Sequence, residues 1–530
     1  MPKVLIADKL AEEGIDILKK AGFIVDCNYG LSEEKLKAGI KEYDAIIVRS
    51  QTKLTEKIIK EADNLKIIGR AGVGVDNVDV NAATKKGIIV MNAPSGNTIS
   101  TCEHTFALLL ALARKIPWAY NSLCRGEWER ARFKGVELYS KVLGIIGLGR
   151  IGKEVAKRAL AFGMKVLGYD PYILSEVADK LGIKLVELNE LLRRADFITI
   201  HTPLTPQTKN LISQQEFSLM KSTVFLINCA RGGIIDESAL YQALKEKRIA
   251  GCALDVFEEE PPLNSKVLNL DNVVATPHLG ATTSEAQVSV AIEIAICVRD
   301  ALLGRAIRNA VNYVPIEPEV YKIIRPFIKL CELMGSFASQ VIEGRAKEIT
   351  ISYMGEIASF KVDPLADAFI KGFLSHILEE DVSFVNAIAI AKSRGIKIEQ
   401  RKIREEEEYV NSIRVKIVTE KEEKSLEGTL FANKEPRLVK INEFHIEVSP
   451  SNYMVVVYNW DKPGVIGSLG TILANHKVNI AAMSLGRSAP SGVAVTILNV
   501  DTPLREEVKK EILANPNIIS LKEIKLNYPG

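Results

Sequence analysis

Short apolar runs alternate with stretches of helical periodicity over the first 92 residues of the chain. Apolar runs of this length are typical of strands buried on both faces, and their alternation with helices predicts a parallel sheet covered on both sides. The pattern then predicts one long apolar helix over 98–118, which leaves this first unit. The strands of the first unit are expected at 4–7, 23–26, 45–48, 65–68 and 88–91.

The same alternation resumes at residue 141 and predicts a second parallel sheet. A helix expected over 284–304 follows it and returns the chain to the first unit, which makes the first unit discontinuous in sequence. The strands of the second unit are expected at 142–146, 165–169, 196–200, 223–228, 250–256 and 272–276.

The pattern changes after residue 312. Up to residue 452 it predicts a mixture of helices and strands, with a charged run at 404–408 that is interpreted as a solvated turn or helix end. The last segment, 453–530, reads strand, helix, strand, strand, helix, strand, which is the ferredoxin-like order. We therefore expect an α/β protein with two doubly wound parallel sheets, an α+β unit and a ferredoxin-like unit. Between 313 and 452 helices are expected at 320–341 and 365–378, and strands at 349–353, 413–417, 427–431, 438–441 and 445–448.

The most specific local motif directly follows the strand expected at 142–146. Gly147, Gly149 and Gly152 form a G-x-G-x-x-G run after which a helical pattern begins at once. Glycines in this run allow a tight turn, a close approach to a pyrophosphate and close helix packing, and the helix N-terminus offers free N–H groups. Asp170 ends the next strand, where a carboxylate accepts ribose hydroxyls and repels a 2′-phosphate. The motif predicts an NAD-binding Rossmann unit, with a glycine-rich turn of another α/β protein as the alternative.

Composition narrows the classes of function. The 530 residues carry a formal net charge of +3, which gives no case for a nucleic-acid or membrane partner. The seven cysteines include no CxxC pair and favour a reducing compartment over a disulfide scaffold. The longest apolar stretch, 106–113, is too short to span a bilayer, and no signal peptide is visible. We expect a cytoplasmic protein without a metal site.

Three loops of the first unit follow the ends of strands, where open α/β sheets place their ligands. They begin at Arg49, Arg70 and Asn92. The middle loop is dense in glycine, so that its backbone N–H groups could cradle a small anion, although a plain turn would read the same way. A basic segment with an aromatic residue, 126–135, is either a solvated loop or an arm that faces a phosphate.

Three residues at three strand ends have complementary chemistry. His278 follows a buried strand in a glycine-flanked loop, and an imidazole suits proton removal from a secondary alcohol near neutral pH. Glu260, in the loop after the preceding strand, can stabilise the charged imidazole. Arg231, at another strand end, offers a bidentate cation to a substrate carboxylate. The remaining histidines, His104, His201, His376, His445 and His476, are interpreted as structural or solvated.

On these motifs the chain resembles the D-isomer-specific 2-hydroxyacid dehydrogenase family. The matching stretches are 147–152, 228–233, 254–261 and 277–280, and the likeness extends over essentially the whole chain. Within the family it is most similar to the long form of phosphoglycerate dehydrogenase. The resemblance implies catalysis by the arginine, glutamate and acid/base histidine of the family, which are Arg231, Glu260 and His278 in this sequence.

The resemblance also implies residues that bind ligands. Asp170 would hold the adenosine ribose and Asp255 the nicotinamide carboxamide. Arg130, Arg132 or Lys134 of the basic segment would reach the substrate phosphate, some of them across a dimer interface. The implied substrate-binding residues are Arg49, Arg70, Val73, Gly74 and Asn97. The implied cofactor-binding residues are Gly147, Gly149, Arg150, Ile151, Gly152, Asp170, Thr202, Cys229, Ala230, Arg231, Asp255, His278 and Gly280.

The activity implied by the resemblance is the NAD-dependent oxidation of 3-phospho-D-glycerate to 3-phosphohydroxypyruvate, the first step of L-serine biosynthesis. The C-terminal segment resembles an ACT domain, in which Asp461 and Asn479 match positions that bind L-serine, and a homodimer or homotetramer is expected. An ACT domain that only oligomerises is the alternative. The implied domains are substrate-binding, 1–97 and 286–312; NAD-binding, 98–285; intervening, of the allosteric substrate-binding type, 313–452; and ACT, 453–530.

Two other functions remain open at this point. A different hydroxyacid dehydrogenase, such as a glyoxylate or hydroxypyruvate reductase, would share every catalytic residue but has no use for Arg49, the basic segment 126–135 or the ACT tail. A non-enzymatic NAD-sensing protein of the co-repressor type would keep the fold for protein contacts, but that type carries no serine-binding tail.

Overall fold

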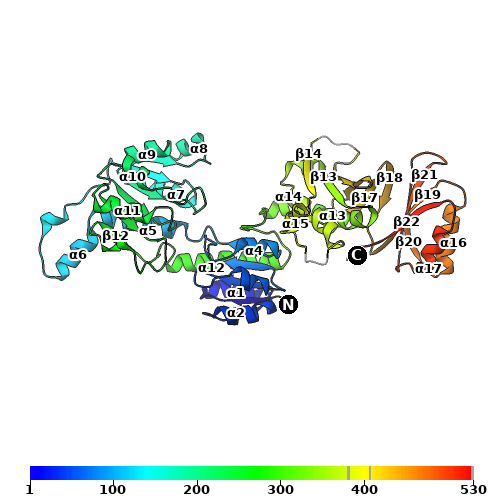
Figure 1. Ribbon diagram of the computed structural model, residues 1–530, viewed down its shortest axis with the longest axis horizontal. Coiled ribbons are helices and arrows are strands. Elements are labelled where there is room, and N and C mark those ends of the chain that lie inside the picture. Colours follow the sequence, from blue (N-terminus) through cyan, green and yellow to red (C-terminus); the bar gives the residue numbers. More distant parts are fainter. Residues whose placement is uncertain (379–381, 405–407, 527–530) are drawn as a thin grey trace.

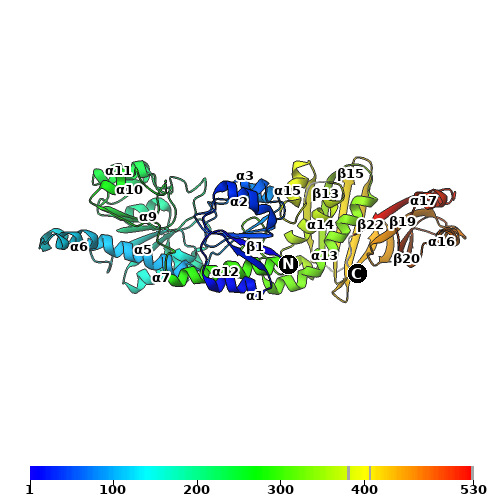
Figure 2. The ribbon, with the colours of Figure 1, turned by 90° about the horizontal axis from the view of Figure 1, so that it is seen from below.

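The computed structural model describes residues 1–378, 382–404 and 408–526, and the middle of the charged run at 404–408 lies outside these residues. Four folded units lie in a row, with the first unit (blue) between the second (cyan and green) and the third (Figures 1 and 2). The C-terminal unit, drawn in orange and red, forms the far end of the row. The expected fold class is confirmed. In the described part of the chain no helix is long and apolar enough to cross a membrane.

The first unit is a five-stranded parallel sheet in the order β2-β1-β3-β4-β5, with an apolar core on each face. All five strands lie within two residues of where the apolar runs predict them. The three central strands, β1, β3 and β4, are almost entirely buried, and such strands leave an unambiguous pattern. Its elements are β1 (Lys3–Ile6), α1 (Glu12–Lys20), β2 (Ile24–Cys27), α2 (Glu33–Gly39), β3 (Ala45–Val48), α3 (Glu56–Lys60), β4 (Ile67–Arg70), α4 (Val80–Lys85) and β5 (Ile89–Asn92).

The helix α12 (Ser284–Leu302) completes this first unit although it follows the second unit in sequence. It packs against α1 and β4, and its apolar face belongs to the core of the first sheet. The helices meet closely: a Cβ at Gly14 of α1 would lie 2.7 Å from the carbonyl oxygen of Ala291. Val298, Ile294 and their neighbours are buried there, each worth roughly 1.5–3 kcal/mol. The first unit is therefore assembled from two distant stretches of chain.

The second unit is a seven-stranded parallel sheet in the order β12-β11-β10-β9-β6-β7-β8. The order reverses between β6 and β9, and open α/β sheets bind their ligands at such a point. The two-residue edge strand β8 is an element that the apolar pattern did not predict. The elements are α5 (Thr98–Ala113), α6 (Ile116–Cys124), β6 (Val142–Ile146), α7 (Arg150–Ala161), β7 (Lys165–Tyr169), α8 (Ser175–Lys180), β8 (Lys184–Leu185), α9 (Leu188–Arg194), β9 (Phe197–Ile200), α10 (Gln214–Leu219), β10 (Phe225–Asn228), α11 (Glu237–Lys245), β11 (Gly251–Leu254) and β12 (Val273–Ala275).

The prediction of a single helix over 98–118 is wrong. The helix α5 ends at Ala113, and α6 starts at Ile116 after Lys115, whose φ of 56° is left-handed. Pro117 causes the break, because it has no N–H to donate to the carbonyl oxygen four residues back, as one continuous helix would require. The apolar pattern continues across the break, which is why it suggested one helix. As a result α6 projects from the outer end of the second unit (Figures 1 and 2).

The third unit is a mixed six-stranded sheet in the order β14-β13-β15-β16-β17-β18, in which β14 is parallel to β13 and the other pairs are antiparallel. The strand β14 was not predicted because it is charged and lies at the edge of the sheet, where little of it is buried. The elements are α13 (Pro318–Val341), β13 (Ala346–Gly355), α14 (Asp363–Ser375), α15 (Ala387–Ser393), β14 (Lys397–Ile403), β15 (Asn411–Thr419), β16 (Glu423–Phe431), β17 (Glu435–Ile441) and β18 (Phe444–Val448).

The C-terminal unit has the expected ferredoxin-like order, with antiparallel strands in the order β20-β21-β19-β22. One face of the sheet packs under α16 and α17, and the other shares the core of the third unit. Gln340 of α13 also pairs with both backbone groups of Lys525. The two units are thus joined through a continuous core. The elements are β19 (Tyr453–Trp460), α16 (Val465–Asn475), β20 (Ile480–Arg487), β21 (Val493–Val500), α17 (Glu506–Leu513) and β22 (Ile518–Lys525).

Candidate active site

The glycine run between β6 and α7 adopts the geometry that its spacing predicts. Gly147 has a φ of +94°, and a Cβ there would lie 2.6 Å from the carbonyl oxygen of His201. A Cβ at Gly152 would lie 2.1 Å from the carbonyl oxygen of Gly147. Gly149, by contrast, faces open space at the N-cap of α7, whose first turn contains Arg150 and Ile151. The free N–H groups of this helix end fit the pyrophosphate of a dinucleotide.

Polar groups line the neighbouring strand ends. The carboxylate of Asp170, after β7, accepts hydrogen bonds from the backbone N–H groups of Leu148 and Tyr172 at 2.8 and 2.9 Å. After β9, the hydroxyl of Thr202 and Nδ1 of His201 are buried and have no hydrogen-bond partner among the described residues. Burial lowers the pKa of His201 to about 3, so its imidazole is neutral. Unpartnered buried polar atoms beside an open helix end fit NAD bound across the switch point between β6 and β9.

His278 and Glu260 are in direct contact. His278 Nδ1 lies 2.8 Å from Glu260 Oε2, and both side chains are partly exposed. The other carboxylate oxygen of Glu260 accepts a hydrogen bond from the backbone N–H of Phe257 at 3.2 Å. Burial alone would raise the pKa of Glu260, but the hydrogen bond and charge of His278 bring that pKa below its ordinary value. Glu260 therefore stays ionised beside the imidazole, whose Nε2 is left for a substrate.

Asp255 holds the loop that carries His278. Its buried carboxylate accepts hydrogen bonds from the Thr276 hydroxyl at 2.6 Å and from the backbone N–H groups of Leu279 and Gly280 at 2.6 and 2.8 Å. Burial alone would raise the pKa of Asp255, but hydrogen bonds from His104, Thr276 and these N–H groups lower it. Asp255 thus contacts the catalytic loop and His104 of α5, an arrangement that the sequence reading did not anticipate.

Arg231 sits in a tight turn after β10. The buried side chain of Asn228 braces this turn, since its Nδ2 donates to the carbonyl of Arg231 and its Oδ1 accepts from the N–H of Ala230. A Cβ at Gly232 would lie 1.8 Å from the carbonyl oxygen of Phe257, so the turn packs directly against the loop of Glu260. Burial raises the pKa of the Cys229 thiol to about 12, which leaves it unreactive. Arg231, Glu260 and His278 therefore follow three neighbouring strands, β10, β11 and β12.

The glycine-rich loop of the first unit reaches Arg231. Arg231 Nε donates to Asp76 Oδ2 at 3.1 Å, and a Cβ at Gly74 would lie 2.0 Å from Arg231 Nη2. Arg70 lies in the same cluster: burial, followed by the charge of Arg231, lowers its pKa to about 10, and its buried Nε lacks a partner among the described residues. Arg49 adds to this effect on Arg70. Arg49 and Arg231 are thus close enough to Arg70 to lower its pKa, and three guanidinium groups gathered in this way form a site for an anion.

The remaining predicted substrate residues lie at the same sheet edge. Asp8, after β1, accepts hydrogen bonds from the backbone N–H groups of Arg49 and Thr52 at 2.6 and 3.2 Å. Val73 accepts one from the side chain of Asn92 at 2.6 Å, and Asn97 at the N-cap of α5 has a buried, unpartnered Oδ1 in the described structure. Sequence reasoning missed Asp8, Asp76 and Asn228, although each stands directly at a strand end or in a loop that it had singled out.

The basic segment 126–135 is not brought to this cluster within the chain. It follows α6, at the outer end of the second unit, whereas Arg49 and Arg70 belong to the first unit (Figures 1 and 2). Arg132 forms an ion pair with Glu129 of its own segment at 3.0 Å.

The two predicted effector residues lie at opposite ends of one strand. Asp461 accepts hydrogen bonds from Arg487, at the end of β20, and from the N–H of Ser491. Asn479, which precedes β20, donates to Asp501 at 2.8 Å. A strand of eight residues separates the two positions by roughly 25 Å. One chain therefore cannot present both residues to the same small ligand.

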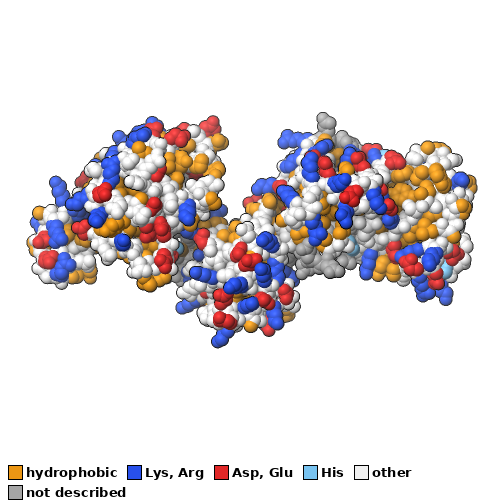
Figure 3. Space-filling view, in the orientation of Figure 1, with side chains coloured by type: hydrophobic (Ala, Val, Ile, Leu, Met, Phe, Trp, Pro, Cys, Tyr) orange, Lys and Arg blue, Asp and Glu red, His pale blue; other side chains and the backbone are white. Residues whose placement is uncertain are grey.

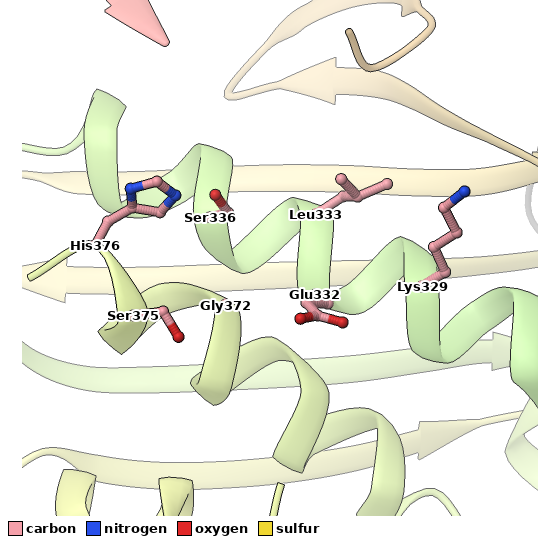
Figure 4. A pocket seen from close by; sticks show the side chains of 7 residues that line it. All are labelled: Lys329, Glu332, Leu333, Ser336, Gly372, Ser375 and His376. Carbon is pink, nitrogen blue, oxygen red and sulfur yellow. The ribbon is translucent and has the colours of Figure 1, made fainter. Parts of the chain in front are cut away.

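A groove of about 300 Å³ lies in the third unit between α13 and α14, away from the edge that carries His278 (Figure 4). The hydroxyl of Ser336 is buried there without a partner among the described residues. Gly372 forms part of its wall, where a Cβ would lie 2.0 Å from the carbonyl oxygen of Glu332. The residues that line the groove are Lys329, Glu332, Leu333, Ser336, Gly372, Ser375 and His376.

Comparisons with known proteins agree with this arrangement. Three family models match in succession: the NAD-binding domain of D-isomer specific 2-hydroxyacid dehydrogenases (106–280), the intervening domain of D-3-phosphoglycerate dehydrogenase (323–442) and the ACT domain (453–517). Proteins named D-3-phosphoglycerate dehydrogenase from Methanocaldococcus jannaschii and Bacillus subtilis are 46% and 42% identical, over 99% of this chain and 100% of theirs. A solved structure of Aquifex aeolicus D-lactate dehydrogenase with NAD and lactic acid aligns with a TM-score of 0.53 at 33% identity, over 57% of this chain and 96% of its own.

Proposed function

Because the chain belongs to the D-3-phosphoglycerate dehydrogenase family and is an NAD-dependent dehydrogenase, we propose that it oxidises 3-phospho-D-glycerate to 3-phosphohydroxypyruvate. The observation that carries the proposal is the contact of His278 with Glu260 at 2.8 Å, beside the turn of Arg231. The reaction is the first step of L-serine biosynthesis. In the cell it therefore supplies a keto acid to a later transamination.

Three side chains carry the chemistry. Arg231 binds the substrate carboxylate and polarises the C2 oxygen through its planar fork of N–H donors. His278 takes the C2 hydroxyl proton on Nε2, since Nδ1 is engaged with Glu260. Glu260 stabilises the positive charge that the imidazole gains. The glycine run of Gly147, Gly149 and Gly152 would hold NAD, which would supply the acceptor for the hydride of C2.

The arginine cluster accounts for the phosphate of the substrate. Arg49 and Arg70 lie in loops of the first unit, and Arg70 keeps an unpartnered buried Nε in the described structure. The backbone of Val73 and Gly74 and the side chain of Asn97 complete the substrate site. A glyoxylate or hydroxypyruvate reductase would need no such cluster, and an NAD-sensing co-repressor would need no catalytic pair.

Steady-state kinetics test the proposal. The wild-type chain should reduce NAD with 3-phospho-D-glycerate and use 2-hydroxyacids without a phosphate much less well. His278→Ala should lower kcat by about a hundredfold or more, the usual range for a general acid/base. His445→Ala, a histidine on a strand of the third unit, should leave kcat unchanged. A His278→Ala variant with wild-type turnover would remove the catalytic assignment, and equal use of unphosphorylated acids would remove the substrate assignment.

We also propose one domain for each of the four units. We assign substrate binding to 1–97 and 286–312, NAD binding to 98–285, an intervening domain to 313–452 and an ACT domain to 453–530. We place the chain in the cytoplasm, where its seven free cysteines would stay reduced.

A homo-oligomer is part of the proposal, and exposed apolar surface in two places supports it. On α6, Ile116, Tyr120 and Leu123 are more than half exposed and recur at helical spacing. On β20 the side chains of Met483 and Leu485 are exposed at a sheet edge. Figure 3 shows hydrophobic side chains gathered over the C-terminal sheet. Pairing of these surfaces between copies would bury them.

L-Serine binding at the ACT domain is proposed between two copies rather than within one. An antiparallel pairing of two β20 edges about a twofold axis would bring Asp461 of one chain to Asn479 of the other, because these residues flank opposite ends of the strand. The pairing would form two equivalent sites. Titration of the wild-type enzyme with L-serine during turnover tests it, since an ACT domain that only oligomerises would give no change in rate.

The groove between α13 and α14 is the place where the intervening domain would take a second ligand (Figure 4). The Ser336 hydroxyl, which has no hydrogen-bond partner among the described residues, and the imidazole of His376 can both donate to a small acid. Burial and the charge of Lys525 lower the pKa of His376, so its ring is neutral near pH 7.

A further inference from the structure

A second histidine lies beneath the loop that carries His278. His104 Nε2, on α5, is 3.2 Å from Asp255 Oδ1 and 3.0 Å from the hydroxyl oxygen of Thr276. The sequence pattern marked His104 only as a structural or solvated residue of an apolar helix. In the folded chain its side chain is 17% exposed and meets the carboxylate that organises the catalytic loop.

The catalytic loop needs such an anchor because its conformation is unusual. His278 has a φ of +54°, in the left-handed region that side chains other than glycine seldom adopt. Its N–H donates to the carbonyl oxygens of Asp255 and Thr276 at 2.9 and 3.0 Å. The next two N–H groups of the loop bind the Asp255 carboxylate. Asp255 thus fixes the peptides on the C-terminal side of the strained residue.

His104 is the member of this network that comes from a different element. The other donors to the Asp255 carboxylate belong to residues 276–280, whereas His104 lies on α5. The same face of α5 sends the hydroxyls of Ser100 and Thr101 to the carbonyl oxygen of Gly280, at 2.8 and 3.1 Å. The helix α5 therefore contacts the loop network at two points, the Asp255 carboxylate and the carbonyl oxygen of Gly280.

The helix α5 also begins at the substrate loop. Asn97, a proposed substrate residue, is its N-cap, and His104 follows two turns later. The helix α5 therefore connects Asn97 to the His278 loop, so that a movement at the substrate site would be transmitted to the loop.

We propose that His104 is a positioning residue that acts through Asp255 to hold His278 against Glu260 in its left-handed conformation. The inference rests on the proposed role of His278 as the proton acceptor. An Nε2–H group donates from His104 to the Asp255 carboxylate and competes with no loop donor, because carboxylate oxygens accept more than one hydrogen bond. Without this donor the loop would relax toward a more populated backbone conformation, and the imidazole of His278 would lose its alignment.

The test compares a variant that removes the donor with one that keeps it. In His104→Leu the side chain keeps its bulk but cannot donate, and we expect kcat to fall at least tenfold while KM for NAD and for 3-phospho-D-glycerate changes less than threefold. In His104→Gln the amide nitrogen can reach the place of Nε2, and kcat should return to within threefold of wild type. Glu103→Ala, an exposed neighbour on the same helix, should behave as wild type.

Thr276→Val supplies a second variant with almost the same shape as wild type. It removes the hydroxyl that contacts both Asp255 and His104, and it should lower kcat with little effect on KM. The double variant with His104→Leu should lose less than the product of the two single losses, because both act on one carboxylate.

The outcomes separate this inference from the proposed function. If His278→Ala is inactive while His104→Leu keeps wild-type kcat, the positioning role is wrong and the catalytic assignment stands. If His104→Leu and His104→Gln lose activity equally, the imidazole acts through bulk or folding rather than as a donor, and the inference also fails. If His278→Ala is fully active, the catalytic role proposed for His278 is wrong, and the positioning role of His104 is wrong with it.

Discussion

Asp76 of the first unit accepts a hydrogen bond at 3.1 Å from Nε of Arg231 in the second unit. The contact joins the two α/β units through Arg231, the residue that is proposed to bind the substrate carboxylate. The Asp76 side chain is 67% exposed, so solvent screens this ion pair and an incoming carboxylate can displace it. Asp76 thus pairs with the Arg231 guanidinium in the free enzyme and competes with the substrate carboxylate for it.

The variant Asp76→Asn should bind the anionic substrate better. It keeps the shape and an acceptor oxygen but removes one negative charge from the arginine cluster. We expect KM for 3-phospho-D-glycerate to fall about two- to fivefold with kcat within twofold, and the effect should shrink at high salt because the site is exposed. Steady-state kinetics at two ionic strengths measure it. A rise in KM would show that Asp76 chiefly orients Arg231.

The variant Glu260→Gln should lower the rate of oxidation. Burial would raise the pKa of Glu260, but the hydrogen bond and charge of His278 lower it, so the carboxylate stays ionised in the neutral range and can stabilise the positive charge that the imidazole gains. Replacing it with a neutral amide of the same shape should lower kcat about tenfold. Steady-state kinetics at pH 7 measure this, and an unchanged kcat would contradict the role of Glu260.

Two glycines of one motif should respond differently to alanine. A Cβ at Gly149 would meet no atom of the described residues within 4 Å, so Gly149→Ala should unfold within about 2 °C of wild type, yet raise KM for NAD tenfold or more by filling the space over the helix end. A Cβ at Gly152 would lie 2.1 Å from a backbone oxygen, so Gly152→Ala should lose roughly 1–3 kcal/mol of stability. Thermal unfolding and NAD titrations of the two variants separate these effects. Equal losses of stability would contradict the prediction.

Asp367 of α14 should make the third unit less stable as pH rises. Burial, and then the charge of Asp363, raises the pKa of Asp367 to about 7, above the ordinary value of 3.8 for a free carboxyl. The folded state therefore holds a proton that the unfolded state releases, and stability falls between about pH 4 and pH 7. Asp367→Asn should stabilise the chain at pH 8, by a few kcal/mol at most, and give no gain at pH 4. Calorimetry at both pH values measures this, with Glu356→Gln, an exposed acid of the third unit that does not perturb Asp367, as the control.

The effector site between chains can be tested by mixing variants. Asp461→Ala and Asn479→Ala should each abolish the response to L-serine, because every site takes one residue from each chain. An assembly of one chain of each variant keeps one site with both native residues, so mixing after dissociation should restore part of the response. Restoration would not occur if both residues served a site within one chain.

Much of the fold follows from local patterns. The central parallel strands are readable because burial on both faces leaves unbroken apolar runs, and glycines mark the turns at their ends. The break at Lys115 was not readable, since apolar periodicity continues through it and only Pro117 signals it. The charged strand β14 was also missed, because an edge strand pairs through its backbone and needs no apolar pattern.

In the candidate site, too, some residues could be predicted from the sequence and others could not. Arg231, Glu260 and His278 could be predicted because each follows a strand whose end lies at a shared sheet edge. Their partners could not, because hydrogen bonds between residues far apart in sequence leave no local signal. Asp76 reaches Arg231 across 155 positions, and His104 reaches Asp255 across 151. The role of His104 emerges only from the fold.

The interleaved first unit has a consequence for synthesis on the ribosome. Its sheet exposes an apolar face until α12 is made, and α12 ends about 205 residues after β5 and its loop. At a translation rate of 5–20 residues per second, the apolar face of the first sheet stays exposed for roughly 10–40 s before α12 is synthesised. The second unit is contiguous and has all its strands before α12 emerges. The nascent chain therefore finishes its second unit before its first.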